Sequence, residues 1–130
     1  MGQPAAKRGD QIVAIDTHVV MVPPAVPTPL PHPFTGRITG GLSTNVRIAG
    51  EPAAMVGSTA DNLPPHLPTA PGVSFQKPPA NRGTIQSGST TVMINGKPAA
   101  RAGDRATTCN DPSDLPAGTV LVPTGTVLIG

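Results

Sequence analysis

The chain has 130 residues, a length typical of one domain, and a formal net charge of only +2. It contains 18 Pro and 15 Gly, no Trp or Tyr and only two Phe, which excludes a mainly helical protein because helices tolerate Pro and Gly poorly. The nine basic and seven acidic residues are scattered along the chain, so no basic face for nucleic acid is expected. Intrinsic disorder is an alternative interpretation, but the charged fraction is 12% and Val and Ile occur in discrete clusters.

The first ten residues, "MGQPAAKRGD", lack the apolar segment of a secretory signal, and we expect synthesis in the cytoplasm without a signal peptide. No apolar run reaches the roughly 18 to 20 residues that a membrane-spanning helix needs. A single Cys excludes a disulfide within the chain, so Cys109 is either a spare thiol or a ligand.

A short motif occurs three times along the chain, as "GQPAAKRGD" from residue 2, "GEPAAMVGS" from residue 50 and "GKPAARAGD" from residue 96. Each copy reads Gly-x-Pro-Ala-Ala, followed by Gly five positions after the Pro, and the prolines are separated by 48 and 46 residues. Periods of this length are typical of repeat architectures. We therefore expect one domain over residues 1–130, built from pseudo-repeats of about 1–49, 50–95 and 96–130, without an effector extension.

The segments that precede each motif also resemble one another and read as strand, Gly-containing turn, strand. They are "GRITGGLSTNVRI" from Gly36, "GTIQSGSTTVMI" from Gly83 and "GTVLVPTGTVLI" from Gly118. Alternation in their second halves places three pairs on one face of a strand. These pairs are Val46 and Ile48, Val92 and Ile94, and Val127 and Ile129. Each segment predicts one hairpin, and three hairpins leaning together would bury a thin aliphatic core.

The turns and the ends of the chain complete this prediction. Asn95 and Gly96 tolerate positive φ and predict a turn before the third motif. The residue after the last Gly of each motif, which is Asp10, Ser58 or Asp104, predicts a side-chain cap of a turn. When the motifs are aligned, Met1 occupies the position of Asn95, and when the segments before the motifs are aligned, Gly130 occupies that same position. We therefore expect the two ends of the chain to meet, so that the three repeats form a closed ring. The predicted fold is all-β, a small three-sided arrangement of short hairpins with pseudo-threefold repeats and Pro/Gly-rich loops.

Every His and the only Cys form a candidate ligand set of His18, His32, His66 and Cys109. His18 and His66 each follow the Pro of their motif by 14 residues, and Cys109 follows Pro98 by 11. Three imidazoles and one thiolate suit one structural, tetrahedral Zn²⁺. The alternative is that the histidines are surface residues and the thiol a small apolar side chain.

Three further side chains have ordinary structural explanations. Asp16, two residues before His18, is expected to be a solvated loop carboxylate. Phe34 and Phe75 are expected to plug the core between the Pro-rich loops.

With its motifs, intervening hairpins and Cys-His₃ set, the chain resembles the PAAR-repeat family. The third motif reads "PAAR", whereas the first reads "PAAK" and the second "PAAM". The resemblance implies a β-rich cone that carries zinc near its point and sits, one per trimer, on a trimeric β-helical spike protein of a contractile injection machine. Its docking base would contain the motif residues. These are Pro4, Ala5, Ala6, Pro52, Ala53, Ala54, Pro98, Ala99, Ala100 and Arg101.

The long Pro-rich segments also resemble the subgroup of extracellular, phage-tail-like injection systems, with type VI secretion as the other context. The resemblance then implies assembly into a particle, release or delivery outside the cell, and transient contact with the target envelope. An adaptor that carries effectors is an alternative. A small zinc hydrolase is a weaker alternative, because four ligands would close the metal shell and no Glu lies beside a His. We therefore expect a structural protein without enzymatic activity.

Overall fold

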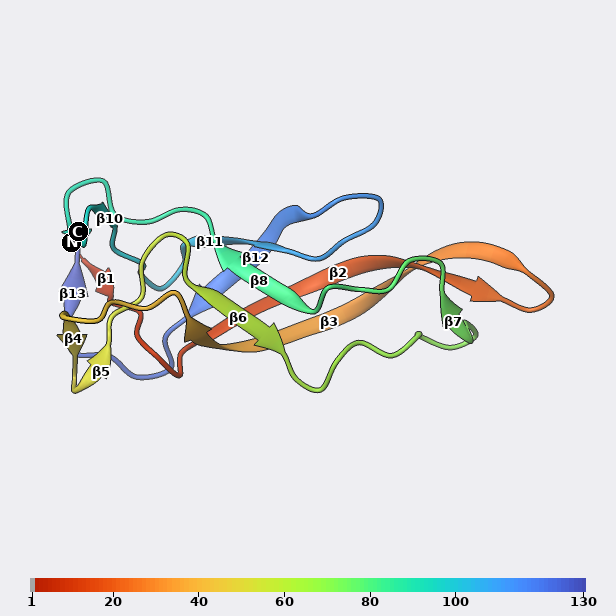
Figure 1. Ribbon diagram of the computed structural model, residues 1–130, viewed down its shortest axis with the longest axis horizontal. Coiled ribbons are helices and arrows are strands. Elements are labelled where there is room, and N and C mark those ends of the chain that lie inside the picture. Colours follow the sequence, from red (N-terminus) through yellow and green to blue (C-terminus); the bar gives the residue numbers. More distant parts are fainter. Residues whose placement is uncertain (1) are drawn as a thin grey trace.

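A computed structural model describes residues 2–130, and these residues contain strands, turns and loops but no helix (Figure 1). No helix long and apolar enough to span a membrane is therefore found in this part of the chain. The prediction of an all-β fold is confirmed. The strands are β1 (Gln3–Pro4), β2 (Gln11–Val22), β3 (Val26–Gly40), β4 (Arg47–Ile48), β5 (Glu51–Pro52), β6 (Thr59–Asn62), β7 (Ser74–Phe75), β8 (Arg82–Ile85), β9 (Met93–Ile94), β10 (Lys97–Pro98), β11 (Arg105–Thr108), β12 (Leu115–Leu121) and β13 (Leu128–Ile129).

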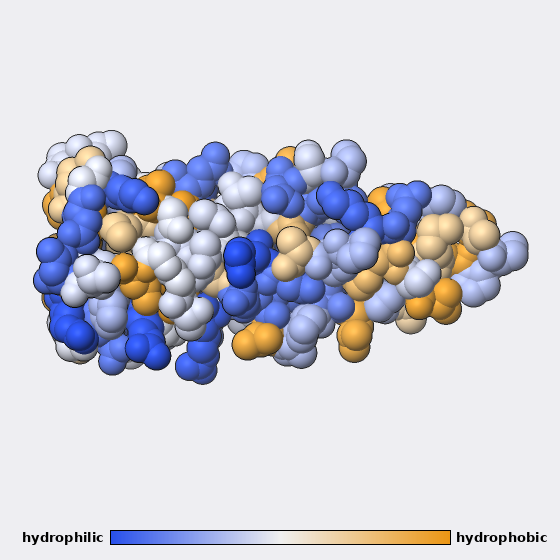
Figure 2. Space-filling model, viewed as in Figure 1, coloured by the Kyte–Doolittle hydropathy of each residue, from blue (hydrophilic) through white to orange (hydrophobic). Residues whose placement is uncertain are grey.

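Six strands form a closed barrel in the order β12-β11-β8-β6-β3-β2, and β12 pairs again with β2. Each repeat supplies two antiparallel neighbours, namely β2 and β3, β6 and β8, or β11 and β12. The first pair is much the longest. Figure 1 shows it extending beyond the other strands to the narrow end of the molecule, where the short strand β7 pairs with β2. The space-filling view in Figure 2 shows the same taper from a broad base to a narrow tip.

Strand β3 contains a Pro at every second position from Pro27 to Pro33. Successive residues of a strand direct their N–H groups to opposite sides, so alternate prolines remove donors from one side only. Pairing with β2 is continuous along this stretch, from Gln11 opposite Arg37 to Val22 opposite Val26. A Pro-rich sequence can therefore form half of a long hairpin whose outer edge cannot extend the sheet.

The predicted hairpins lie elsewhere than expected. The segments from Gly36, Gly83 and Gly118 do not pair with themselves, because their first halves belong to the barrel. Their second halves, β4, β9 and β13, pair with the first strands of the motifs, β5, β10 and β1. At Asn95 and Gly96, φ is 52° and 79°, which gives the tight two-residue turn that joins β9 to β10. The turn prediction is confirmed, and the tight turn selects the neighbouring motif strand as the partner.

The two ends of the described chain lie together at the broad base (Figure 1). Gln3 is opposite Ile129 and Pro4 is opposite Leu128, so β1 and β13 form the third of three equivalent short ladders. This pairing confirms the predicted closure of the ring. The part of that prediction that concerns Met1 lies outside the described residues.

The core has two sections. One lines the barrel and contains Ile12, Phe34 and Ile38 together with the inner alanines of the motifs. The other lies in the base and contains Ile48, Ile94, Ile129 and the first alanines of the motifs. The prediction that these three isoleucines face inward is confirmed, but Val92 and Val127 are 37% and 42% exposed because the segments before β9 and β13 are loops.

Candidate metal centre and threefold base

A closed ring of hydrogen bonds joins the three motifs at the broad end. The N–H of Ala6 donates to the carbonyl of Ala100 (2.9 Å), Ala54 to Ala6 (3.0 Å) and Ala100 to Ala54 (3.1 Å). All three side chains are fully buried. Because each alanine both donates to one motif and accepts from the other, the ring has threefold symmetry in its backbone although it is made by a single chain.

The residue that follows the two alanines of each motif makes the same contact in all three repeats. It forms an antiparallel bridge with the first alanine of the next motif. The bridges are Lys7 with Ala53, Met55 with Ala99, and Arg101 with Ala5. The predicted turn caps are confirmed, since each of these three N–H groups donates to a side-chain oxygen three residues later. The acceptors are Asp10 (2.9 Å), Ser58 (3.1 Å) and Asp104 (2.7 Å).

The predicted docking residues lie in this ring, but most of them are not accessible. The six alanines are at most 1% exposed, and the three prolines and Arg101 are half-buried. The exposed side chains of the base come instead from the short ladders. Arg47, Met93 and Leu128 occupy equivalent positions opposite the motif prolines, and the last two are 57% and 61% exposed. Each directly precedes a buried Ile, so strand alternation was the signal that could have identified this row.

The candidate metal centre lies between the barrel and the tip. One ligand atom from each of Asp16, His18, His66 and Cys109 lies within 4.8 Å of all the others, and all four residues are buried. Asp16 and His18 project inward from β2, two positions apart. His66 lies in the loop after β6, and Cys109 directly follows β11. All three repeats therefore contribute to one cluster.

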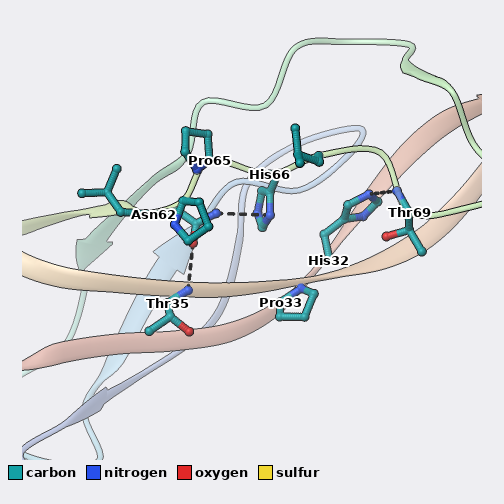
Figure 3. A pocket seen from close by; sticks show the side chains of 10 residues that line it. His32, Pro33, Thr35, Asn62, Pro65, His66 and Thr69 are labelled. Atoms are coloured by element: carbon teal, nitrogen blue, oxygen red, sulfur yellow. Dashed lines mark hydrogen bonds between the residues drawn. The ribbon is translucent and has the colours of Figure 1, made fainter.

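Hydrogen bonds to the backbone hold the loops of the centre in place. The side chains of Asn110 and Asp111 accept from the N–H groups of Thr17 (2.7 Å) and Val19 (2.8 Å), on either side of His18. The loop that carries Cys109 is thereby fastened along the exposed edge of β2. His66 is fixed by its own N–H, which donates to the side chain of Asn81 (2.8 Å), and Asn62 lies 3.2 Å from its Nδ1 (Figure 3).

Burial dominates the electrostatics of this centre. Burial lowers the pKa of His18, and the neighbouring His66 lowers it further. Burial, reinforced by Asp16, raises the pKa of the Cys109 thiol to about 11. Among residues 2–130, only the two ring nitrogens of His18 are buried side-chain polar atoms without a hydrogen-bond partner. Buried polar atoms are normally paired, so an unpaired imidazole in a cluster of donors fits a metal ion.

Asp16 corrects one of our expectations. It was expected to be a solvated loop carboxylate, but it lies within β2 and is fully buried. Its neighbours are Thr108, Cys109, Asn110 and His66. The expectation was wrong because the segment from Gln11 is a strand whose even-numbered residues face inward, which carries Asp16 inside with His18.

His32, the remaining residue of the predicted ligand set, lies beside the cluster. Its ring centroid is 5.3 Å from that of His18 and 5.6 Å from that of His66. Phe75 covers both His18 and His32 at centroid distances of 5.7 and 5.4 Å. Phe34 is fully buried in the barrel as predicted, whereas Phe75 is half-buried over the histidines.

The donor set of two imidazoles, a thiol and a carboxylate suits a borderline divalent cation. Such an ion would be held by His18, His66 and Cys109 with an oxygen or a third nitrogen. It would join the three repeats by bonds stronger than the hydrogen bonds between them.

The comparison with protein families identifies the repeat. The model of the PAAR motif matches residues 76–130, which include the third motif, Cys109 and the last barrel strand. A search of the curated proteins found no match. The matched segment contains one of the three corners of the ring described above, at Ala100, and the other two corners make the same hydrogen bonds. Residues 76–130 therefore carry a PAAR motif.

Proposed function

We propose that this protein is the metal-stabilised tip of a contractile injection machine, one copy of which caps a trimeric, β-helical spike protein and sharpens it for piercing the target envelope. Residues 1–130 act as one domain whose three units face the three subunits of the spike. The extracellular, phage-tail-like machines are the context favoured by the long Pro-rich hairpin, and the protein is released with the assembled particle.

The observation that carries this proposal is the ring of Ala6, Ala54 and Ala100. A single chain can contact three identical subunits equally only if it presents three equivalent surfaces. The ring, the three bridges and the three short ladders repeat the same backbone geometry around one axis. The base therefore matches a threefold partner without having to be a trimer.

The contact surface that we propose is the row of Arg47, Met93 and Leu128 with the ladder edges next to it. A two-stranded ladder leaves backbone donors and acceptors unpaired at its outer edges. Spike strands that end at the base would pair with these edges, and Met93 and Leu128 would be buried against the spike. The buried alanines contribute indirectly, because they keep the three ladders at equal distances.

The narrow end is stabilised differently. We propose one structural Zn²⁺ at His18, His66 and Cys109, which ties the loop of each repeat to the base of the long hairpin. The role is mechanical rather than enzymatic. A tip that must be driven into an envelope benefits from prolines, which lower the entropy of the unfolded chain, and from a metal that cross-links its loops.

The test is co-purification with the trimeric spike protein of the same injection machine, followed by native mass spectrometry. The expected complex contains three spike subunits and one tip. Charging the row with Met93→Asp and Leu128→Asp is expected to abolish the complex. Leu67→Asp is the matched control, because Leu67 is 79% exposed but lies in the loop between β6 and β7, away from the ladders. A different stoichiometry, or equal loss in the control, would contradict the proposal.

A further inference from the structure

Two stretches of the sequence contain no Lys, Arg, Asp or Glu, namely residues 17–36 and residues 62–76. The first contains the outer part of the long hairpin, and the second contains the loop before β7 and β7 itself, which pairs with β2. The nine basic and seven acidic residues all lie elsewhere in the chain. On the face that Figure 2 shows, the extreme of the narrow end accordingly carries only apolar and weakly polar residues.

The end of the long hairpin extends beyond the candidate metal centre. Residues 19–30, which we call the apex hairpin, contain the turn that joins β2 to β3. His18 and Val22 are four residues apart on β2, and each residue of a strand advances about 3.4 Å, so the apex hairpin reaches roughly 14 Å past the centre. This length is close to half of the hydrocarbon thickness of a bilayer, which is about 30 Å.

Apolar side chains are exposed at this end of the molecule. Val26, in the apex hairpin, is 52% exposed, and Val73, next to β7, is 67% exposed. The N–H of Val73 donates to the carbonyl of Met21 (2.9 Å), which holds the loop against the apex hairpin. Exposed apolar side chains gain free energy when they leave water, and here no charged side chain opposes that transfer.

The backbone of the apex hairpin lacks free donors along the outer edge of β3. The odd-numbered residues of this strand direct their backbone nitrogen away from β2, as the N–H of Thr35 shows by donating to the side chain of Asn62 (2.9 Å). In the apex hairpin the corresponding residues are Pro27 and Pro29, which have no N–H. The opposite edge, on β2, is covered by β7.

These features suit hydrocarbon better than an aqueous partner. Inside a bilayer no water bonds to a free N–H, so a donor that is removed or already paired avoids a cost that exists only there. Protection against aggregation in water does not require a charge-free edge, because charged side chains such as Lys serve that purpose. A protein that paired with this edge would use its N–H groups rather than require their removal.

We propose that the apex hairpin enters the hydrocarbon of the target membrane, to about the depth of one leaflet. Its partner is the acyl-chain region rather than the lipid headgroups, because the apex hairpin has no charge with which to bind a headgroup. The inference rests on the proposed piercing function. Docking is tested separately, since binding of the isolated chain to vesicles requires no spike protein, and failure here would leave the spike complex unaffected.

The direct test uses the full chain with one Trp introduced, because the chain contains no other. Val26→Trp reports on the apex hairpin. Leu121→Trp is the matched control, since Leu121 is exposed on β12 opposite Gln11, where β2 begins. With vesicles of phosphatidylcholine brominated on its acyl chains, we expect quenching and a blue shift of the emission for Val26→Trp only. Equal quenching of both variants, or of neither at saturating lipid, would overturn the proposal.

Charged variants give an independent readout through vesicle flotation. Val26→Asp is expected to lower the partition coefficient at least about tenfold, because a carboxylate is poorly tolerated inside a membrane, whereas Leu121→Asp is expected to change it less than about twofold. Binding to phosphatidylcholine is expected to be unaffected by added phosphatidylglycerol or by salt. Binding that requires the anionic lipid and disappears in salt would overturn the proposal, because charged residues outside the apex hairpin would then carry it.

The proline edge is tested with a second matched pair. Pro29→Ala restores one outward N–H within the apex hairpin, and Pro33→Ala restores one on the same edge but nearer to the base, opposite Ile15. Pro29→Ala is expected to lower the partition coefficient at least about fivefold, and Pro33→Ala to change it less than about twofold. Unchanged partitioning of Pro29→Ala, with self-association in water instead, would show that the prolines prevent aggregation and would overturn their role in lipid.

Discussion

The broad base of this molecule is built from repeated contacts, whereas its narrow tip is built from segments that differ between the repeats. In the base, three copies of one motif make the same hydrogen bonds, bridges and turn caps around an axis. Towards the tip, the repeats diverge: the first contributes a hairpin of 12 and 15 residues, and the others contribute loops that pack against it. Their common element is a cluster with donors from all three repeats. In the proposed function, the symmetric end contacts the spike protein, and a metal ion stabilises the end where the symmetry is lost.

The largest predicted effect concerns the tip. Removing the metal with a chelator is expected to cost about 4 kcal/mol of folding free energy, the linkage value for a ligand at about 1,000 times its dissociation constant. At this chain length, that corresponds to a fall in melting temperature of at least about 10 °C. Calorimetry of the metal-loaded and chelated chains checks it. Identical melting of a fully loaded and a metal-free sample would contradict a structural metal.

The second prediction concerns the packing of the alanine ring in the base. Ala54→Leu adds three carbons at a fully buried position in the alanine ring and is expected to cost about 1 to 3 kcal/mol through overpacking. Ala117→Leu, on the exposed face of β12, is the matched control and is expected to change stability by less than about 0.5 kcal/mol. Chemical denaturation measures both. Equal effects in the two variants would mean that the ring is not tightly packed.

The third prediction separates two versions of the turn cap. Asp104→Ala removes the acceptor of the Arg101 N–H and its ion pair of 2.9 Å, and we expect a loss of about 1 to 2 kcal/mol. Ser58→Ala removes a neutral cap from Met55 and is expected to cost about 1 kcal/mol. If Ser58→Ala proved the more damaging in denaturation, the ion pair would not strengthen the third corner.

The smallest effect is that of pH on the metal-free chain. Burial lowers the pKa of both His18 and His32 below the ordinary value of 6.5. The unfolded chain therefore takes up these protons first, and stability falls as the pH drops below about 6.5. We expect the melting temperature of the chelated protein to decrease by a few degrees between pH 7 and pH 5. A constant or rising value over this interval would contradict the burial of these rings.

Local pattern predicted the symmetric part of the molecule well. The motif repeat indicated the three corners and their caps at Asp10, Ser58 and Asp104, because each depends on residues close in sequence. The meeting of the two ends, which are far apart in sequence, followed from the alignment of the repeats. The pairing partners of the strands were harder to predict. The sequence suggested that β9 would pair with the strand before its Gly-containing turn, but the tight turn at Asn95 pairs it with β10 instead.

The tip was predicted less completely. Matching offsets pointed to His18, His66 and Cys109, which the structure brings together. Asp16 was missed because its burial depends on which residues of β2 face inward. The neighbouring Pro-rich sequence makes it hard to recognise this segment as a strand. The relation of His32 to the cluster depends on a loop that packs against it from another repeat, and no local pattern reports such a contact.

Hydrogen exchange of the full chain with and without metal tests the central contrast most directly. On chelation, the loops at residues 63–81 and 109–114 are expected to exchange at least about tenfold faster. The amides of Ala6, Ala54 and Ala100 are expected to keep their protection, because the motif ring holds them. Loss of protection at the ring to the same extent as at the loops would contradict an account in which the repeat holds the base and the metal holds the tip.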